Sequence, residues 1–180
     1  MFKLITKTIA TVAIVSVALF GSANAKTLKI ETHFTASSPN GEVAAQFAKN
    51  VEMFSGGSLK VQMFYSSSVT GKSAEVFNSA QTGIIDCDMT GAGYQTGKNA
   101  AFQFAGDVMG GYDNPYQQYD FLKFPGAQDA VDALYNKYGM TLIGWWIPGH
   151  ESLISSKPIP DVASIKDFKF RSPPGMESMI

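Results

Sequence analysis

Cysteine and histidine are scarce in this chain of 180 residues. The single cysteine, Cys87, excludes a disulfide within the chain. It stands in the strand-like run 84–89 and is expected to be a small packed residue rather than a nucleophile. The two histidines, His33 and His150, have no second ligand at metal-binding spacing, so the sequence predicts no metal site.

Motifs of common enzymes and of nucleotide-binding proteins are also missing. The sequence has no Walker A run and no Gly-x-Ser-x-Gly nucleophile elbow. The run 91–97 has glycines like those of a dinucleotide fingerprint, but the third comes one place late and no clear helix follows. The formal net charge is −1 without any block of one sign, which gives no basic face for nucleic acid. We therefore expect no enzyme activity, no cofactor and no nucleic-acid partner.

No apolar run is long enough to cross a membrane. The longest, 9–20, has about a dozen residues, whereas a spanning helix needs about 20. Two lysines precede this run, and Ala23-Asn24-Ala25 follows it as a small-x-small cleavage site. Residues 1–25 are therefore predicted to be a cleavable signal peptide that exports the mature chain to a bacterial periplasm.

The mature sequence alternates between strand-like and helix-like segments. Strands are predicted at 27–32, 59–64, 84–89 and 140–146, with a fifth beginning at 153–154, and helices at 39–55, 71–82 and 126–138. The first helix is predicted to begin with Ser38 as its N-cap and Pro39 at its first position, and to end at Gly56-Gly57. Its apolar residues at helical spacing are Val43, Phe47, Val51 and Phe54. Strands that alternate with crossover helices favour a mostly parallel sheet covered on both faces, so the predicted fold class is α/β. The loop-rich stretch 91–114 carries several aromatics, which either serve a function or cover the sheet edge.

Arg171 is the strongest candidate for a ligand contact. It ends a short apolar run and is followed by a proline, which places it where a strand stops and a loop begins. Open α/β sheets present their ligand-binding groups at such positions. A guanidinium group there offers a planar fork that fits a carboxylate in two parallel hydrogen bonds.

Aromatic and polar residues gather at or near the other predicted strand ends. Small-ligand sites are mostly apolar and aromatic with a few placed polar groups. The candidate ligand-binding residues are Arg171, His150, Glu151, Tyr94, Trp146 and Phe34, and His33, Tyr65 and Trp145 lie in the same segments. Trp145 and Trp146 are adjacent in a predicted strand and should face opposite ways, so at most one can line a cleft. Each aromatic taken singly could equally belong to the core.

Several segments, in order, resemble the solute-binding subunits of tripartite ATP-independent periplasmic (TRAP) transporters, the DctP-type family. The segments that carry this resemblance are Leu28-Lys29-Ile30, Ser37-Ser38-Pro39, Gln46-Phe47-Ala48, Ser55-Gly56-Gly57-Ser58-Leu59-Lys60-Val61, Gly83-Ile84-Ile85-Asp86, Ser156-Lys157-Pro158-Ile159 and Ile165-Lys166-Asp167-Phe168-Lys169-Phe170-Arg171. No single motif is decisive, but the ordered set covers nearly all of the mature chain.

The resemblance implies a periplasmic binding protein-like architecture of two α/β lobes that close on one small organic anion. It implies that the family's carboxylate-binding arginine is Arg171, and that the solute passes to a membrane permease driven by a sodium gradient. Residues 26–150 would form the first lobe and 151–180 the hinge and the start of the second. Because the family's mature chains are about twice as long, we expect this chain to be a fragment.

One departure from the family pattern bears on metal binding. The resemblance aligns a glutamine of the α-keto acid-binding branch, which helps to hold the ligand and a metal ion, with His150. Histidine is a poorer partner for a hard cation such as sodium, so this departure disfavours a metal-bridged ligand.

Three other functions stay open at the level of the sequence. An ABC-type or sensory periplasmic binding protein would show the same pattern. A secreted enzyme would need its catalytic residues beyond residue 180. A structural domain would leave the ordered set of motifs unexplained.

Overall fold

The computed structural model describes residues 25–106, 108, 111–147, 152, 154–166, 168–169 and 171–172. Nearly all of the predicted signal peptide lies outside these residues, as do the candidate residues His150 and Glu151. None of the described helices is both long and apolar enough to span a membrane.

The described strands form one parallel sheet, as the sequence predicts. Strands β1 (Lys26–Thr32), β2 (Leu59–Phe64) and β3 (Cys87–Met89) lie in the order β2-β1-β3. Both neighbours run parallel to β1, with Leu28 opposite Val61 in β2 and Glu31 opposite Asp88 in β3. The first crossover runs from β1 to β2, and the second runs back from β2 past β1 to β3. Because they cross the sheet in opposite directions, right-handed connections place their helices on opposite faces.

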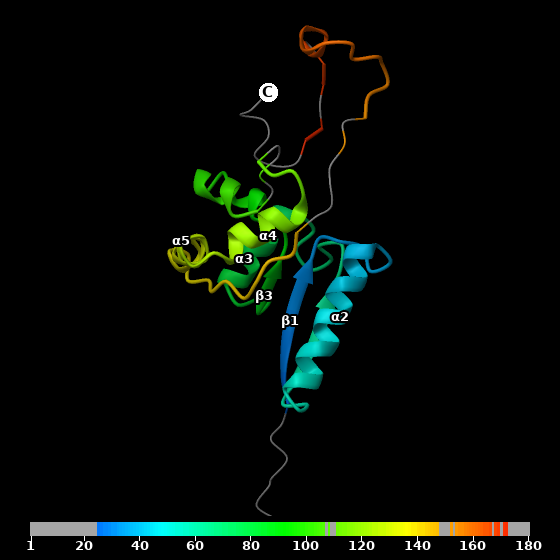
Figure 1. Ribbon diagram of the computed structural model, residues 1–180. Coiled ribbons are helices and arrows are strands. Elements are labelled where there is room, and N and C mark those ends of the chain that lie inside the picture. Colours follow the sequence, from blue (N-terminus) through cyan, green and yellow to red (C-terminus); the bar gives the residue numbers. More distant parts are fainter. Residues whose placement is uncertain are drawn as a thin grey trace, which may run out of the picture.

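Helix α2 (Pro39–Phe54) makes the first of these crossovers and lies on one side of β1 (Figure 1). Its start follows the predicted pattern, because the Ser38 hydroxyl oxygen accepts from the Gly41 N–H at 3.0 Å and Pro39 occupies the first turn. It ends before Gly56 and Gly57, whose φ angles of +61° and +80° are left-handed.

The buried stripe of α2 differs from the predicted one. The sequence spacing predicts a face that includes Val43 and Phe54, but these side chains are 56% and 80% exposed. The helix instead buries Ala44, with Phe47 and Val51 half-buried beside it. The face is thus rotated from the predicted one, and small residues lie at its centre.

The opposite side of β1 carries α3 (Val76–Gln81), α4 (Pro115–Lys123) and α5 (Pro125–Asn136) (Figure 1). Short 3-10 turns complete the described chain at Ser73–Glu75, Ala92–Gln95, Ala100–Phe104 and Val162–Ile165. Helices α3 and α5 confirm two predicted helices. Helix α4 was not predicted, because its glutamines, Asp120 and exposed aromatics give no clean apolar stripe.

Three strand predictions are wrong in extent or in kind. The third strand begins at Cys87 rather than at residue 84, because Ile84 and Ile85 belong to the turn after α3. Residues 140–147 pair with no other strand, and Ile154 is not in a strand either. An alternating apolar pattern requires only that alternate side chains are buried. Met140, Leu142 and Trp145 satisfy it by packing against the hydrophobic core.

The main hydrophobic core lies on the α3 and α5 side of the sheet. Its fully buried members Phe77 and Phe102 meet edge-to-face with ring centroids 5.8 Å apart. The remaining buried members are Ala92, Ala105, Val131 and Leu134, with Tyr135, Tyr138, Met140, Leu142 and Trp145 packed against them. This core therefore fixes the segment 140–145 beside the sheet without strand pairing.

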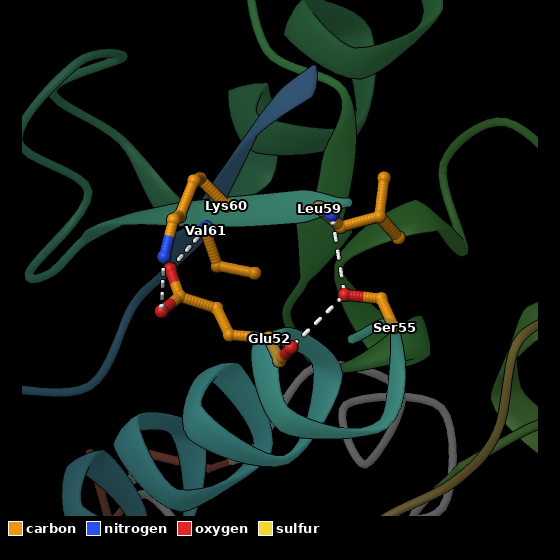
Figure 2. Close-up of polar contacts among 5 residues, drawn as sticks. All are labelled: Glu52, Ser55, Leu59, Lys60 and Val61. Atoms are coloured by element: carbon orange, nitrogen blue, oxygen red, sulfur yellow. Dashed lines mark hydrogen bonds and ion pairs between the residues drawn. The ribbon is translucent and has the colours of Figure 1, made fainter. Parts of the chain in front are cut away.

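Glu52, in the last turn of α2, ties the helix to β2 (Figure 2). Its Oε1 accepts from the Val61 N–H at 2.9 Å, and its Oε2 lies 3.6 Å from Lys60 Nζ. Ser55 adds a second tie, because its hydroxyl donates to the Glu52 carbonyl and accepts from the Leu59 N–H. These bonds satisfy backbone groups at the turn between helix and strand.

We predict that Glu52→Ala lowers the free energy of unfolding of the full-length protein by about 1–2 kcal/mol, because the Val61 N–H loses its acceptor. Lys60→Ala should cost less than about 1 kcal/mol, because the ion pair is exposed to solvent. Urea unfolding followed by circular dichroism measures both values. Equal losses in the two variants would show that the ion pair, not the backbone bond, holds the turn.

Candidate functional site

The loop after β1 carries the first candidate residues to the carboxyl end of the sheet. His33 and Phe34 directly follow Thr32, the last residue of β1. The loop then presses against the start of α2, where a Cβ on Gly41 would lie 2.0 Å from the Thr35 carbonyl oxygen. Only glycine allows this approach, so the position of His33 and Phe34 depends on Gly41.

Four aromatic rings meet at this end of β1 and form what we call the aromatic cluster: His33, Phe34, Tyr94 and Trp146. The His33 ring centroid lies 3.8 Å from that of Phe34 and 5.5 Å, edge-to-face, from that of Tyr94. The Phe34 centroid lies 4.2 Å from that of Trp146. All four side chains are half-buried. The structure thus brings together three of the predicted site residues, Phe34, Tyr94 and Trp146, from segments far apart in the sequence.

The two tryptophans divide as the sequence predicts. Trp145 packs against the hydrophobic core, whereas Trp146 packs against Phe34. The prediction of opposite faces is therefore confirmed, although the segment is extended without being a strand.

His33 was noted in the sequence among the residues near strand ends but was not chosen as a site residue. Its Nδ1 is buried and has no hydrogen-bond partner within the described part of the chain. Burial lowers the pKa of the imidazole below its usual value, which keeps the ring neutral at neutral pH. No sequence signal separates such a histidine from a packed one, because burial of one nitrogen is decided by distant segments.

The loop after β2 is held in an unusual conformation beside the aromatic cluster. Ser66 and Ser67 have φ angles of +57° and +51°, a region that residues other than glycine rarely adopt. The Ser66 N–H donates to the Phe34 carbonyl at 2.9 Å and the Ser67 N–H to the Thr32 carbonyl at 3.1 Å. These bonds fix the loop against the segment that carries His33 and Phe34.

Glu31 anchors the same loop from inside the protein. Its side chain is fully buried, and its Oε1 accepts from the Val69 N–H at 2.6 Å and from the Thr70 N–H at 3.4 Å. Its Oε2 has no partner among the described residues. A buried carboxylate is costly unless it is hydrogen-bonded, so the two N–H groups offset part of the desolvation.

Asp88 lies opposite Glu31 in the neighbouring strand. Burial is the main cause that raises the pKa of the Asp88 carboxyl to about 6, and the negative charge of Glu31 raises it further. The Thr90 hydroxyl donates to Asp88 Oδ1 at 2.6 Å, and this hydrogen bond lowers the pKa of the Asp88 carboxyl by a smaller amount. Asp88 therefore holds its proton to a higher pH than an exposed aspartate.

Cys87 behaves as the sequence predicts. Burial, followed by the charges of Asp86 and Asp88, raises the pKa of its thiol. A half-buried thiol that stays protonated is a poor nucleophile.

Arg171 is not among the residues that form the aromatic cluster. The segment 154–172 (orange to red in Figure 1) extends away from the sheet. Arg171 is exposed. Tyr65 is half-buried at the end of β2. Nowhere in the described ranges do three or more histidine, cysteine, aspartate or glutamate side chains gather in a way that could hold a metal ion.

Comparison with known families gives a match over most of the chain. The model of the family DctP, described as bacterial extracellular solute-binding protein, family 7, matches residues 30–180. A comparison with curated proteins finds no match.

Solved structures with the same fold come from several bacteria. A TRAP periplasmic solute-binding protein from Rhodobacter sphaeroides, in an open form without ligand, is 25% identical with a TM-score of 0.61, over 66% of this chain and 37% of that one. A second, from Pseudoalteromonas atlantica with bound sodium and pyruvate, is 19% identical with a TM-score of 0.59, over 64% and 35%. An extracytoplasmic solute receptor from Bordetella pertussis that binds pyroglutamic acid is 20% identical with a TM-score of 0.55, over 66% and 38%.

These likenesses establish the fold as that of the TRAP solute-binding proteins. In each case the match takes in little more than a third of the other protein's own length.

We predict that the stability of the full-length protein falls as the pH rises from about 4 to about 6. In this window the folded state keeps the Asp88 proton, whereas the unfolded state has released it. Deprotonation of Asp88 in this window costs free energy only in the folded state. The stability that the Asp88 proton contributes is therefore lost as the pH rises through about 6. Asp88→Asn should remove this step and be more stable than the wild type at pH 7.5, by on the order of 1–2 kcal/mol.

Urea unfolding at pH 4.5 and pH 7.5 tests this prediction. Asp113→Asn, a change at an exposed aspartate, is the matched control and should follow the wild type at both pH values. A wild type and an Asp88→Asn variant whose stabilities differ equally at both pH values would contradict the assignment of the proton to Asp88.

Proposed function

This chain belongs to family 7 of the bacterial extracellular solute-binding proteins, the DctP family, and we propose that it captures a small organic acid in the periplasm for a TRAP permease. The family is one of solute-binding proteins in transport, not of enzymes. The observation that carries the proposal is the family match over residues 30–180, joined to an aromatic cluster at the carboxyl end of β1. Ligands of open α/β sheets bind at that end of the strands.

Arg171 is proposed to bind the carboxylate of the solute. It lies within the residues that match the family and ends the motif that resembles the family's arginine segment. Its side chain is exposed, and a guanidinium group can form a bidentate pair with a carboxylate. Pyruvate and pyroglutamic acid, bound by two proteins of the same fold, are both carboxylates.

The aromatic cluster is proposed to hold the body of the solute. Phe34 and Trp146 offer apolar surface, and Tyr94 adds a hydroxyl group at the margin. His150 and Glu151 are proposed as adjustable polar contacts to the same solute, on the strength of their place in the sequence after Trp146.

The proposed transport cycle uses two lobes, and residues 151–180 are proposed to be the hinge and the start of the second. The signal peptide exports the protein, and the two lobes close on the acid. The closed form then delivers the acid to membrane subunits that are driven by a sodium gradient. The lobes must discriminate between solutes by binding alone, because no chemical step follows in the receptor.

We predict that the full-length mature protein binds a small carboxylate with a Kd in the micromolar range or tighter. Thermal shift against a panel of keto acids, hydroxy acids, dicarboxylates and sugar acids, with and without sodium, should show one class that raises the melting temperature. Titration calorimetry with that acid then gives the Kd. Arg171→Ala should weaken binding by about 30-fold or more, since loss of a charge-assisted pair costs on the order of 2–5 kcal/mol.

Two variants control for charge and for folding. Lys169→Ala, a change at an exposed cation in the same segment, should leave the Kd unchanged. Arg171→Lys should recover only part of the affinity, because an ammonium group lacks the planar fork. Full affinity in Arg171→Ala would remove Arg171 from the site, and the absence of binding by every acid would refute the proposed function.

A further inference from the structure

Among the described residues, three buried side-chain atoms able to form hydrogen bonds have no partner. They are Glu31 Oε2, His33 Nδ1 and Trp145 Nε1. Glu31 already accepts two N–H groups through its other oxygen, and Trp145 belongs to the hydrophobic core. His33 alone combines an unpartnered atom with a place in the aromatic cluster.

An unpartnered nitrogen in such a place calls for a physical reason. A buried polar atom without a partner costs about 1–3 kcal/mol, so folded proteins satisfy nearly all of them. The His33 ring is held on one side by Phe34 and at its edge by Tyr94, and it is only half-buried. The chain therefore holds this imidazole in place while leaving Nδ1 without a hydrogen bond from its own described residues.

The charge state of His33 limits what Nδ1 can bind. Burial lowers the pKa of the ring, so at neutral pH it is an uncharged donor or acceptor and not a cation. An uncharged imidazole is a weak partner for a carboxylate compared with a guanidinium group. It is well suited to form a hydrogen bond with an uncharged hydroxyl, carbonyl or amide group.

We infer that His33 is the residue that determines solute preference, and that its Nδ1 hydrogen-bonds an uncharged polar group next to the carboxylate of the solute. The inference rests on the proposed function and narrows it. The solute class is a small acid that carries one hydroxyl, carbonyl or amide group close to its carboxylate, with a short planar or apolar body that packs against Phe34 and Trp146. Acids that lack the polar group leave Nδ1 unpaired and bind less tightly.

Matched pairs of acids isolate the polar group. Lactate and propionate differ by one hydroxyl, and pyroglutamate and cyclopentanecarboxylate differ by the ring amide. The wild-type full-length protein should bind the polar member of at least one pair about tenfold or more tightly, because a site built to pair a polar group rejects the analogue that lacks it.

Two substitutions of His33 separate its ring nitrogens. The side-chain amide of asparagine reaches the position of Nδ1, whereas that of glutamine reaches the position of Nε2. His33→Asn should keep the preference for the polar acid, and His33→Gln should reduce it to about threefold or less while leaving the Kd of the acid without that group unchanged. Melting curves without ligand report whether each variant is folded.

Nitrogen-15 NMR of the wild type gives a reading that needs no folded variant. The Nδ1 resonance of His33 should shift on addition of the polar acid and stay in place with its partner acid. A preference kept in His33→Asn and lost in His33→Gln, with the Kd of the other acid unchanged, supports the inference, as does the selective NMR shift.

Several outcomes would overturn the inference and leave the proposed function standing. They are acids bound without preference within any pair, a preference kept in His33→Gln or lost in both variants, equal weakening of both acids in the folded variants, and an Nδ1 resonance that does not shift with the polar acid. Wild-type protein that binds no acid at all would refute the proposed function together with this inference.

Discussion

The buried carboxylate of Glu31 constrains the carboxyl edge of the sheet. It lies at the end of β1 and accepts hydrogen bonds from the Val69 and Thr70 N–H groups of the loop after β2. That loop holds Ser66 and Ser67 in left-handed conformations, which cost on the order of 1–3 kcal/mol each unless the surroundings fix them. The loop in turn is bonded to the backbone of Thr32 and Phe34, the segment that places the aromatic cluster.

The aromatic cluster shows how this edge becomes a recognition surface. Gly41 lets the loop after β1 approach α2, the core fixes Trp145, and the extended backbone then turns Trp146 toward Phe34. A rigid set of rings costs little entropy when a solute is bound, because their positions are already fixed. A receptor that performs no chemistry depends on this kind of preorganised discrimination.

Part of this structure could be predicted from the sequence. The cap at Ser38, the glycines that end α2 and the parallel α/β order follow from local rules, and they were predicted correctly. Helix α4 and the unpaired segment 140–147 were not, because tertiary packing decided both. The ordered motifs pointed to the family that the match over residues 30–180 establishes.

The candidate site was predicted less completely than the fold. Phe34, Tyr94 and Trp146 were predicted as ligand-binding residues, and the structure brings them together at the carboxyl end of β1, although their role in binding stays a prediction. Glu31 and the unpartnered Nδ1 of His33 were missed, because burial of a polar atom depends on contacts that no local pattern encodes. The role of Arg171 stays a prediction.

A crystal structure of the full-length protein with its bound acid tests the account most directly. The account predicts the body of the acid against Phe34 and Trp146 and its carboxylate on Arg171. An acid bound away from the carboxyl end of β1 would contradict it.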